Sequence, residues 1–147
     1  MSVQGGPFSI HDSSLVLHLD AGNLKSYLSG STSWKDLSGN GYNGVLVNAP
    51  VVSSGLTLNG TTQYAYISHG GALAFNSGQF TISVWHRNND SSTTYNGIIT
   101  NDSNGDNAWK IFRDNGNAFY VARSNGYTAN FPAYTVNRLS LIHISEP

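Results

Sequence analysis

The chain has 147 residues, a formal net charge of −1 and only 10% charged residues. A chain of this length can bury one hydrophobic core, and a surface without a basic excess argues against nucleic acid or an acidic membrane as a partner. Because the sequence contains no cysteine, it excludes a disulfide framework and a thiolate metal site.

The first 13 residues are expected to form an N-terminal arm. They contain neither a basic start nor an apolar run, so we expect no secretory signal within them. No apolar run anywhere approaches the roughly 20 residues that span a bilayer, so we expect no membrane insertion.

Strand-like periodicity begins after this arm. Residues 15–19 and 80–85 alternate in the way that places one side of a strand inward, and we assign Trp34 and Trp85 to core packing. The stretch 21–33 between the early segments is predicted to be a loop, and no helix longer than a turn is expected.

Two hairpins stand out further along. Residues 56–58 lead through Asn59-Gly60 to residues 64–67, and residues 109–113 lead through an Asp-Asn-Gly turn to residues 118–123. Asn and Gly accept the positive φ angles that tight turns require. Many short strands joined by such turns predict an all-β fold, a two-sheet antiparallel sandwich or jelly roll over residues 14–138.

The last nine residues, 139–147, look foreign to the rest of the chain. Their sequence, L-S-L-I-H-I-S-E-P, resembles the translation of a common sequencing adapter, so we predict a non-native tail and a domain that is incomplete at its C-terminus. The alternative is a genuine edge strand, because the segment also alternates. Glu146, the only glutamate of the chain, lies in this tail.

One long motif carries a family resemblance. It comprises L-V-L-H-L-D-A-G-N at residues 15–23 and W-K-D-L-S-G-N-G-Y-N-G at residues 34–44. It resembles the N-terminal signature of the concanavalin-A-like lectin/glucanase superfamily, in the laminin-G-like branch, with variants similar to tail and fibre proteins of tailed bacteriophages. Residues 58–67 and 80–85 resemble later strands of that family more loosely.

The resemblance implies a jelly-roll sandwich located in a virion or outside a cell. Cell-surface glycans or other virion proteins are the partners it implies. Asn59 and Gln63 depart from the pattern, since carboxylates are common at both positions, and this puts calcium binding there in doubt.

Catalysis has little support in the sequence. Glycoside hydrolysis needs two carboxyl groups flanking the scissile bond, and the nearest pair, Asp102 and Asp106, is better explained as a polar turn. No serine lies in a Gly-x-Ser-x-Gly elbow, and the histidines are scattered. We therefore expect no enzyme.

Calcium is the one cofactor that we consider. Asp102, Asn104 and Asp106 alternate like the start of an oxygen-rich cation loop, although no glutamate follows at the spacing of an EF-hand. A second set comprises Asp20, Asp36 and Asn40. For that set we favour capping of the loop by Asx side chains.

Sugar binding is the strongest positive hypothesis. Aromatic rings offer apolar faces to sugar C–H groups, and amides fix hydroxyls. The candidate ligand-binding residues are Trp109, Tyr95, Asn96 and Tyr127. The alternative is that these aromatic residues belong to the core or to a sheet surface.

Three functions therefore remain open. The first is a glycan-binding or adhesive domain of a phage virion, and the second is a structural decoration domain without a ligand. The third is an accessory carbohydrate-binding module, or a truncated domain, of a secreted bacterial glycoside hydrolase.

Overall fold

The computed structural model describes residues 13–52, 55–73, 80–87, 96–101, 109–113, 119–123, 128–131 and 139–145. Within these residues the fold is all-β: every strand pairs antiparallel and no helix occurs, as predicted. No helix in the described part of the chain could therefore cross a membrane. The contacts divide the chain into two compact units, Met1–Ala72 and Leu73–Pro147.

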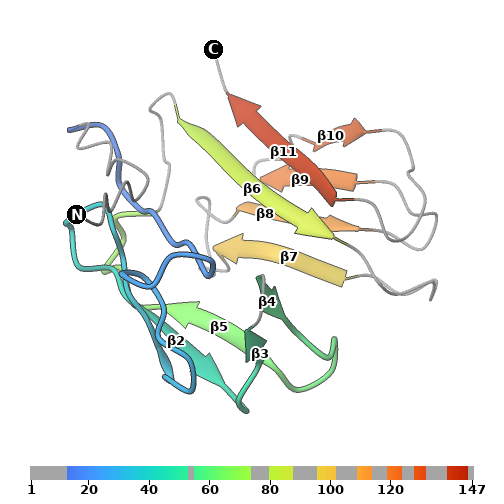
Figure 1. Cartoon of the computed structure of the whole chain (residues 1–147). Helices are drawn as coiled ribbons and strands as arrows, with labels where there is room; N and C mark the ends of the chain where they lie inside the picture. The colour runs from blue at the N-terminus through green and yellow to red at the C-terminus, as the bar shows by residue number, and fades with distance from the viewer. Residues whose placement is uncertain are drawn as a thin grey trace, which may run out of the picture. The chain divides into compact units, whose positions relative to one another are not determined.

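The N-terminal unit contains short strands and long connecting loops (Figure 1). A three-stranded sheet has the order β1-β2-β5, and β3 and β4 form a separate pair. The bounds are β1 Ser33–Trp34, β2 Gly44–Val47, β3 Val51–Val52, β4 Leu56–Thr57 and β5 Tyr64–Ile67. The predicted hairpin between residues 56–58 and 64–67 is not formed. Instead β4 pairs with β3, and β5 pairs with β2.

Trp34 explains the glycine that ends the long motif. It pairs with Gly44 across β1 and β2, and a Cβ at Gly44 would lie 3.3 Å from Trp34 Cβ. Trp34 is half-buried and Gly44 is buried. Gly44 has no positive φ, so the requirement for glycine there comes from close packing against Trp34 and not from a turn.

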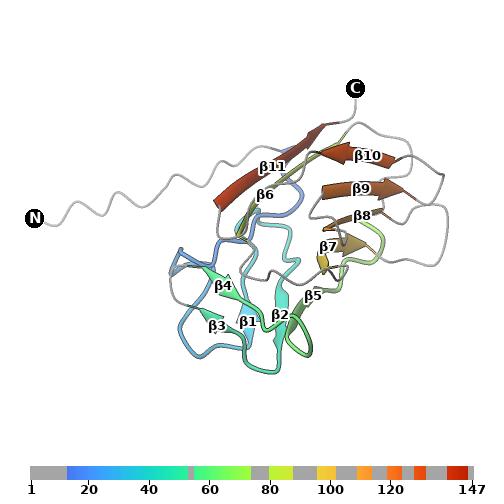
Figure 2. The same ribbon diagram turned by 90° about the vertical axis from the view of Figure 1, so that its right-hand side faces the viewer.

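The C-terminal unit contains longer and more regular strands. A four-stranded sheet has the order β10-β9-β8-β7, and β6 pairs with β11. Figure 1 and Figure 2 both draw the β6–β11 pair as a layer against the four-stranded sheet. The bounds are β6 Thr81–Arg87, β7 Asn96–Asn101, β8 Trp109–Arg113, β9 Phe119–Arg123, β10 Thr128–Phe131 and β11 Leu139–Ser145.

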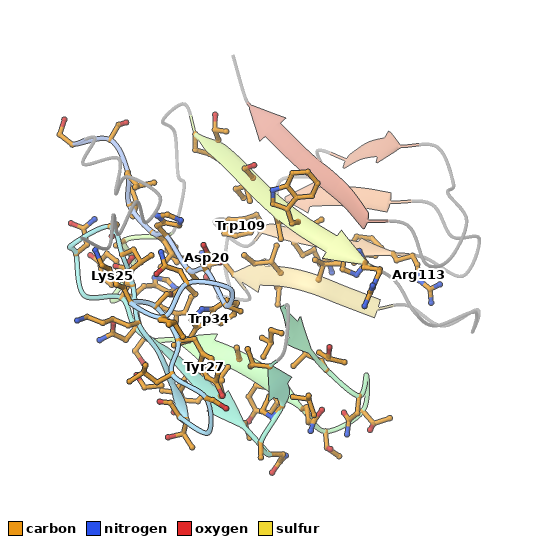
Figure 3. All side chains as sticks on the ribbon, viewed as in Figure 1. Asp20, Lys25, Tyr27, Trp34, Trp109 and Arg113 are labelled. Carbon is orange, nitrogen blue, oxygen red and sulfur yellow. The ribbon has the colours of Figure 1, made fainter. Side chains whose placement is uncertain are left out.

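The inner side of this unit follows strand alternation. Trp109, Ile111 and Arg113 of β8 are buried, whereas Lys110 is exposed. Figure 3 shows Trp109 and Arg113 at opposite ends of β8. Burial lowers the pKa of His86 on β6 below its ordinary value of 6.5, and the positive charge of Arg113 lowers it further.

Trp85 corrects one expectation. Its side chain is 66% exposed, so the assignment of Trp85 to the core is wrong. On β6 the half-buried positions are Ile82, Val84 and His86, and Trp85 lies between two of them. Successive side chains of a strand point to opposite faces, so the period that buries Val84 exposes Trp85.

The segment that we predict to be a foreign tail forms a strand here. All seven residues of β11 pair with β6, from Leu139 opposite Arg87 to Ser145 opposite Thr81. The edge-strand interpretation therefore describes the conformation of residues 139–145, while the origin of the segment stays a prediction.

Candidate functional site

Trp109, the first ligand candidate, lies in the core of the C-terminal unit. Only 5% of its surface is exposed, and its indole Nε1–H donates a hydrogen bond to the Leu73 carbonyl at 2.8 Å. The Asn101 amide donates to the same carbonyl at 2.7 Å. The core interpretation therefore accounts for Trp109, and its ring face is not displayed to solvent.

Asn96 is the one other predicted ligand residue within the described ranges, and it does not lie beside Trp109. Asn96 pairs with Arg113 and Trp109 pairs with Asn101, at opposite ends of the β7–β8 ladder. Along β8 these ends are four steps apart, about 13 Å at the usual rise of a strand. Tyr95 and Tyr127 lie outside the described residues.

The predicted calcium loop also lies outside the described part of the chain, because residues 102–108, with Asp102, Asn104 and Asp106, are not among the described ranges. Among the residues that are described, no three histidine, aspartate or glutamate side chains gather in a way that could hold a metal ion.

Asp36, from the second candidate set, is buried and fastens the long motif to the preceding strand-like segment. Its Oδ1 accepts hydrogen bonds from the backbone N–H groups of His18 and Ser38, at 3.0 and 2.9 Å. Its Oδ2 accepts from the Ser38 hydroxyl at 2.7 Å and from the Tyr42 N–H at 3.1 Å. Both oxygens are therefore engaged within the protein, in what we call the Asp36 latch.

The electrostatics of the latch follow from these donors. Burial alone would raise the pKa of the Asp36 carboxyl, but the hydrogen bonds from His18, Ser38 and Tyr42 favour its charged form and hold the pKa below the ordinary value of 3.8. Asp36 is thus an internal anion whose charge is balanced by backbone dipoles.

Asp20 and Asn40 also act as caps. Asp20 Oδ1 accepts from the Gly22 N–H at 2.9 Å, which closes an Asx turn. The Asn40 amide donates to the carbonyls of Leu15 and Val16, each at 3.0 Å. The expectation that Asp20, Asp36 and Asn40 cap loops is confirmed, and the motif at 34–44 is a structural fastening.

An exposed aromatic pair on β5 is the best candidate for a binding surface. Tyr64 and Tyr66 are 52% and 47% exposed, and their ring centroids lie 6.4 Å apart at an interplanar angle of 41°. Val45 of β2, also exposed, pairs directly with Tyr66, and Val47 pairs with Tyr64. We call these four residues the tyrosine face.

A rigid polar loop adjoins the tyrosine face. The side-chain Oδ1 of Asn59 accepts from three successive backbone N–H groups, those of Thr61, Thr62 and Gln63, each at 3.0 Å. The Gln63 amide donates to the carbonyls of Asn48 and Ala49 at 3.0 and 3.1 Å. The side-chain amides of Asn59 and Gln63 therefore bind backbone groups, and they fix the loop immediately before Tyr64.

The tyrosine face can do two things chemically. Its rings offer apolar surface to sugar C–H groups, and the phenolic hydroxyls can donate or accept hydrogen bonds. This site is not among those predicted from the sequence, although the alternation of residue types along both strands indicates it. Tyr alternates with Ala in residues 64–66, and Val alternates with Leu in residues 45–47, so each pair lies on one face of its strand.

Comparisons with known proteins supply no relative. No family model, no curated protein and no solved structure matches the chain.

Proposed function

We propose that this chain is a non-catalytic binding or scaffolding domain of the laminin-G-like jelly-roll type, glycan-binding or adhesive, in a phage virion structural protein. The observation that carries the binding role is the tyrosine face. Two half-exposed tyrosines stand side by side on a strand whose entry loop is fixed by six hydrogen bonds between two amide side chains, those of Asn59 and Gln63, and backbone groups. A ligand that stacks on these rings therefore loses little binding free energy to the ordering of this loop.

The geometry suits shallow recognition. The rings of Tyr64 and Tyr66 are tilted by 41° to each other and flanked by Val45, which gives an apolar surface with polar edges. A single contact of this kind is weak, and repetition of the domain on a particle would raise its avidity. The family resemblance of residues 15–44 supports the assignment to a virion protein, and it supports the jelly-roll topology as well.

The test is binding of neutral glycans by the full chain displayed in many copies on a bead. A glycan array identifies the best ligand, and the affinity is then measured for the Tyr64→Ala/Tyr66→Ala double variant. We expect a loss of at least tenfold, about 1.4 kcal/mol, because stacking on two rings is removed. The Tyr64→Phe/Tyr66→Phe variant retains the ring faces and should retain most of the binding.

Trp85→Ala is the matched control, since Trp85 is an aromatic residue exposed to a similar degree in the other unit. It should leave the affinity unchanged. Failure of the displayed chain to bind any glycan would overturn the binding role and leave a scaffolding domain. A loss caused by Trp85→Ala but not by the tyrosine variants would move the site away from the tyrosine face.

A further inference from the structure

The outer face of the four-stranded sheet carries a cation on an aromatic ring. On β8 the side chain of Lys110 is exposed and that of Phe112 is half-buried, on the face opposite Trp109, Ile111 and Arg113. The Lys110 Nζ lies 5.7 Å from the centroid of the Phe112 ring. This distance is within the range of a cation–π interaction, which holds the ammonium group against the sheet.

The strand register extends this face across the whole sheet. Positions that pair directly lie on the same face, so the positions of Phe112 and Lys110 each begin a row. The row of Phe112 includes Gly97, Tyr120 and Asn130, and the row of Lys110 includes Thr100, Ala122 and Thr128. Four strands at about 4.8 Å spacing make the face roughly 14 Å wide.

Charge and shape at this face favour one kind of occupant. None of the eight positions holds an aspartate or glutamate, and Lys110 supplies one positive charge. Gly97, directly opposite Phe112, is exposed, and a Cβ placed there would meet no atom within 4 Å. The space directly over Gly97 is therefore open to a ligand.

We propose that this face, which we call the lysine face, binds a saccharide that carries a carboxylate, such as a uronic acid. The carboxylate pairs with the Lys110 ammonium, which stays over the Phe112 ring, and the sugar ring lies beside that ring, over Gly97. The hydroxyl groups of a neutral sugar seated here would replace the water around the ammonium with hydrogen bonds to uncharged acceptors, which are weaker than a bond to a carboxylate. An acidic sugar replaces the lost hydration with a charge-assisted hydrogen bond. The site is separate from the tyrosine face and does not depend on it.

The test compares two probes that differ at their carboxyl groups alone, trigalacturonic acid and its uncharged trimethyl ester. Binding of each to the full chain is measured by isothermal titration at low and high salt. We expect the acid to bind at least fivefold more tightly than the ester, and the preference to shrink as salt screens the pair. Lys110→Gln should abolish the preference, while Lys110→Arg should retain it.

Lys25→Gln is the matched control, because Lys25 is an exposed lysine of the N-terminal unit, and it should change nothing. Gly97→Glu, which places a competing carboxylate beside Phe112, should weaken the acid only. Equal binding of acid and ester, no binding of the acid, or equal losses from Lys25→Gln and Lys110→Gln would each overturn the proposal. The Tyr64→Ala/Tyr66→Ala variant should bind the acid normally, which separates a failure here from a failure of the tyrosine face.

Discussion

The two units of the chain hold their backbones in different ways. In the N-terminal unit, side chains bind backbone groups across long loops, and the Asp36 latch alone accepts four hydrogen bonds. In the C-terminal unit, strands of four to seven residues pair in continuous ladders, and β8 buries Trp109 and Ile111. The first unit therefore depends on particular polar residues, and the second depends on alternation and burial.

The largest effect is expected from the core of the C-terminal unit. Ile111 is completely buried, so Ile111→Ala should lower the free energy of unfolding by about 3–4 kcal/mol, through lost burial and the cavity that remains. Lys110→Ala, on the other face of the same strand, should change it by less than about 0.5 kcal/mol. Urea unfolding measures both values.

Amide hydrogen exchange then locates the loss. Ile111→Ala should speed exchange in β7, β8 and β9 and leave the amides of His18, Ser38 and Tyr42 protected. Equal loss of protection in both units would contradict the comparison, because it would mean that the polar fastening of the first unit has no stability of its own.

The second largest effect should come from the Asp36 latch. Asp36→Ala leaves the donors of His18, Ser38 and Tyr42 without their acceptor, and we expect a cost of about 2–3 kcal/mol. Asp36→Asn should cost nearly as much, because one acceptor oxygen becomes an N–H₂ group that faces donors. The measurement is thermal unfolding with hydrogen exchange at those three amides.

Asp20→Asn provides the control for charge. Asp20 accepts one hydrogen bond, from the Gly22 N–H, and an asparagine can accept the same bond. This variant should therefore be nearly neutral. If Asp20→Asn and Asp36→Asn were equally costly, net charge rather than the latch would account for the loss.

The two regions also differ in what the sequence could reveal. The loop motif at 34–44 contains Asx and Gly residues whose local bonds are predictable, and the capping roles of Asp20, Asp36 and Asn40 follow from them. The all-β class and the strand at 109–113 follow from alternation. Which face of a strand is buried depends on what packs against it, and alternation alone does not contain this information. For this reason the sequence places Trp85 in the core, whereas its side chain is exposed.

The same reason explains the candidate sites. The position of Trp109 beside a polar loop predicts a ligand residue. Its indole N–H instead donates a hydrogen bond to the Leu73 carbonyl, 36 positions earlier in the chain. The spacing of residues in the sequence does not reveal such a long-range contact. The tyrosine face required the register of β2 against β5. The lysine face required the register of four strands. Local patterns predict the strands, whereas surfaces that span several strands need the pairing.

The smallest effect, and the sharpest test of the comparison, is the dependence of stability on pH. The folded pKa values of His86 and Asp36 both lie below their ordinary values of 6.5 and 3.8. In the pH range where each group titrates, the unfolded chain therefore binds more protons than the folded chain. The free energy of unfolding consequently decreases as the pH falls through that range. His86 should destabilise the C-terminal unit from about pH 6.5 downward, and Asp36 should destabilise the N-terminal unit only below about pH 3.8.

Hydrogen exchange at a series of pH values separates the two windows, because each unit contains one of the groups. His86→Gln should flatten the first decline, measured in β6 and β8, and leave the second unchanged. Asp36→Asn should remove the second decline and leave the first. If His86→Gln did not alter the slope below pH 6.5, the lowered pKa of His86 in the folded chain would be contradicted. If both units declined together in both windows, their stabilities would be coupled, and the contrast between polar fastening and buried ladder would not describe two separable parts of the chain.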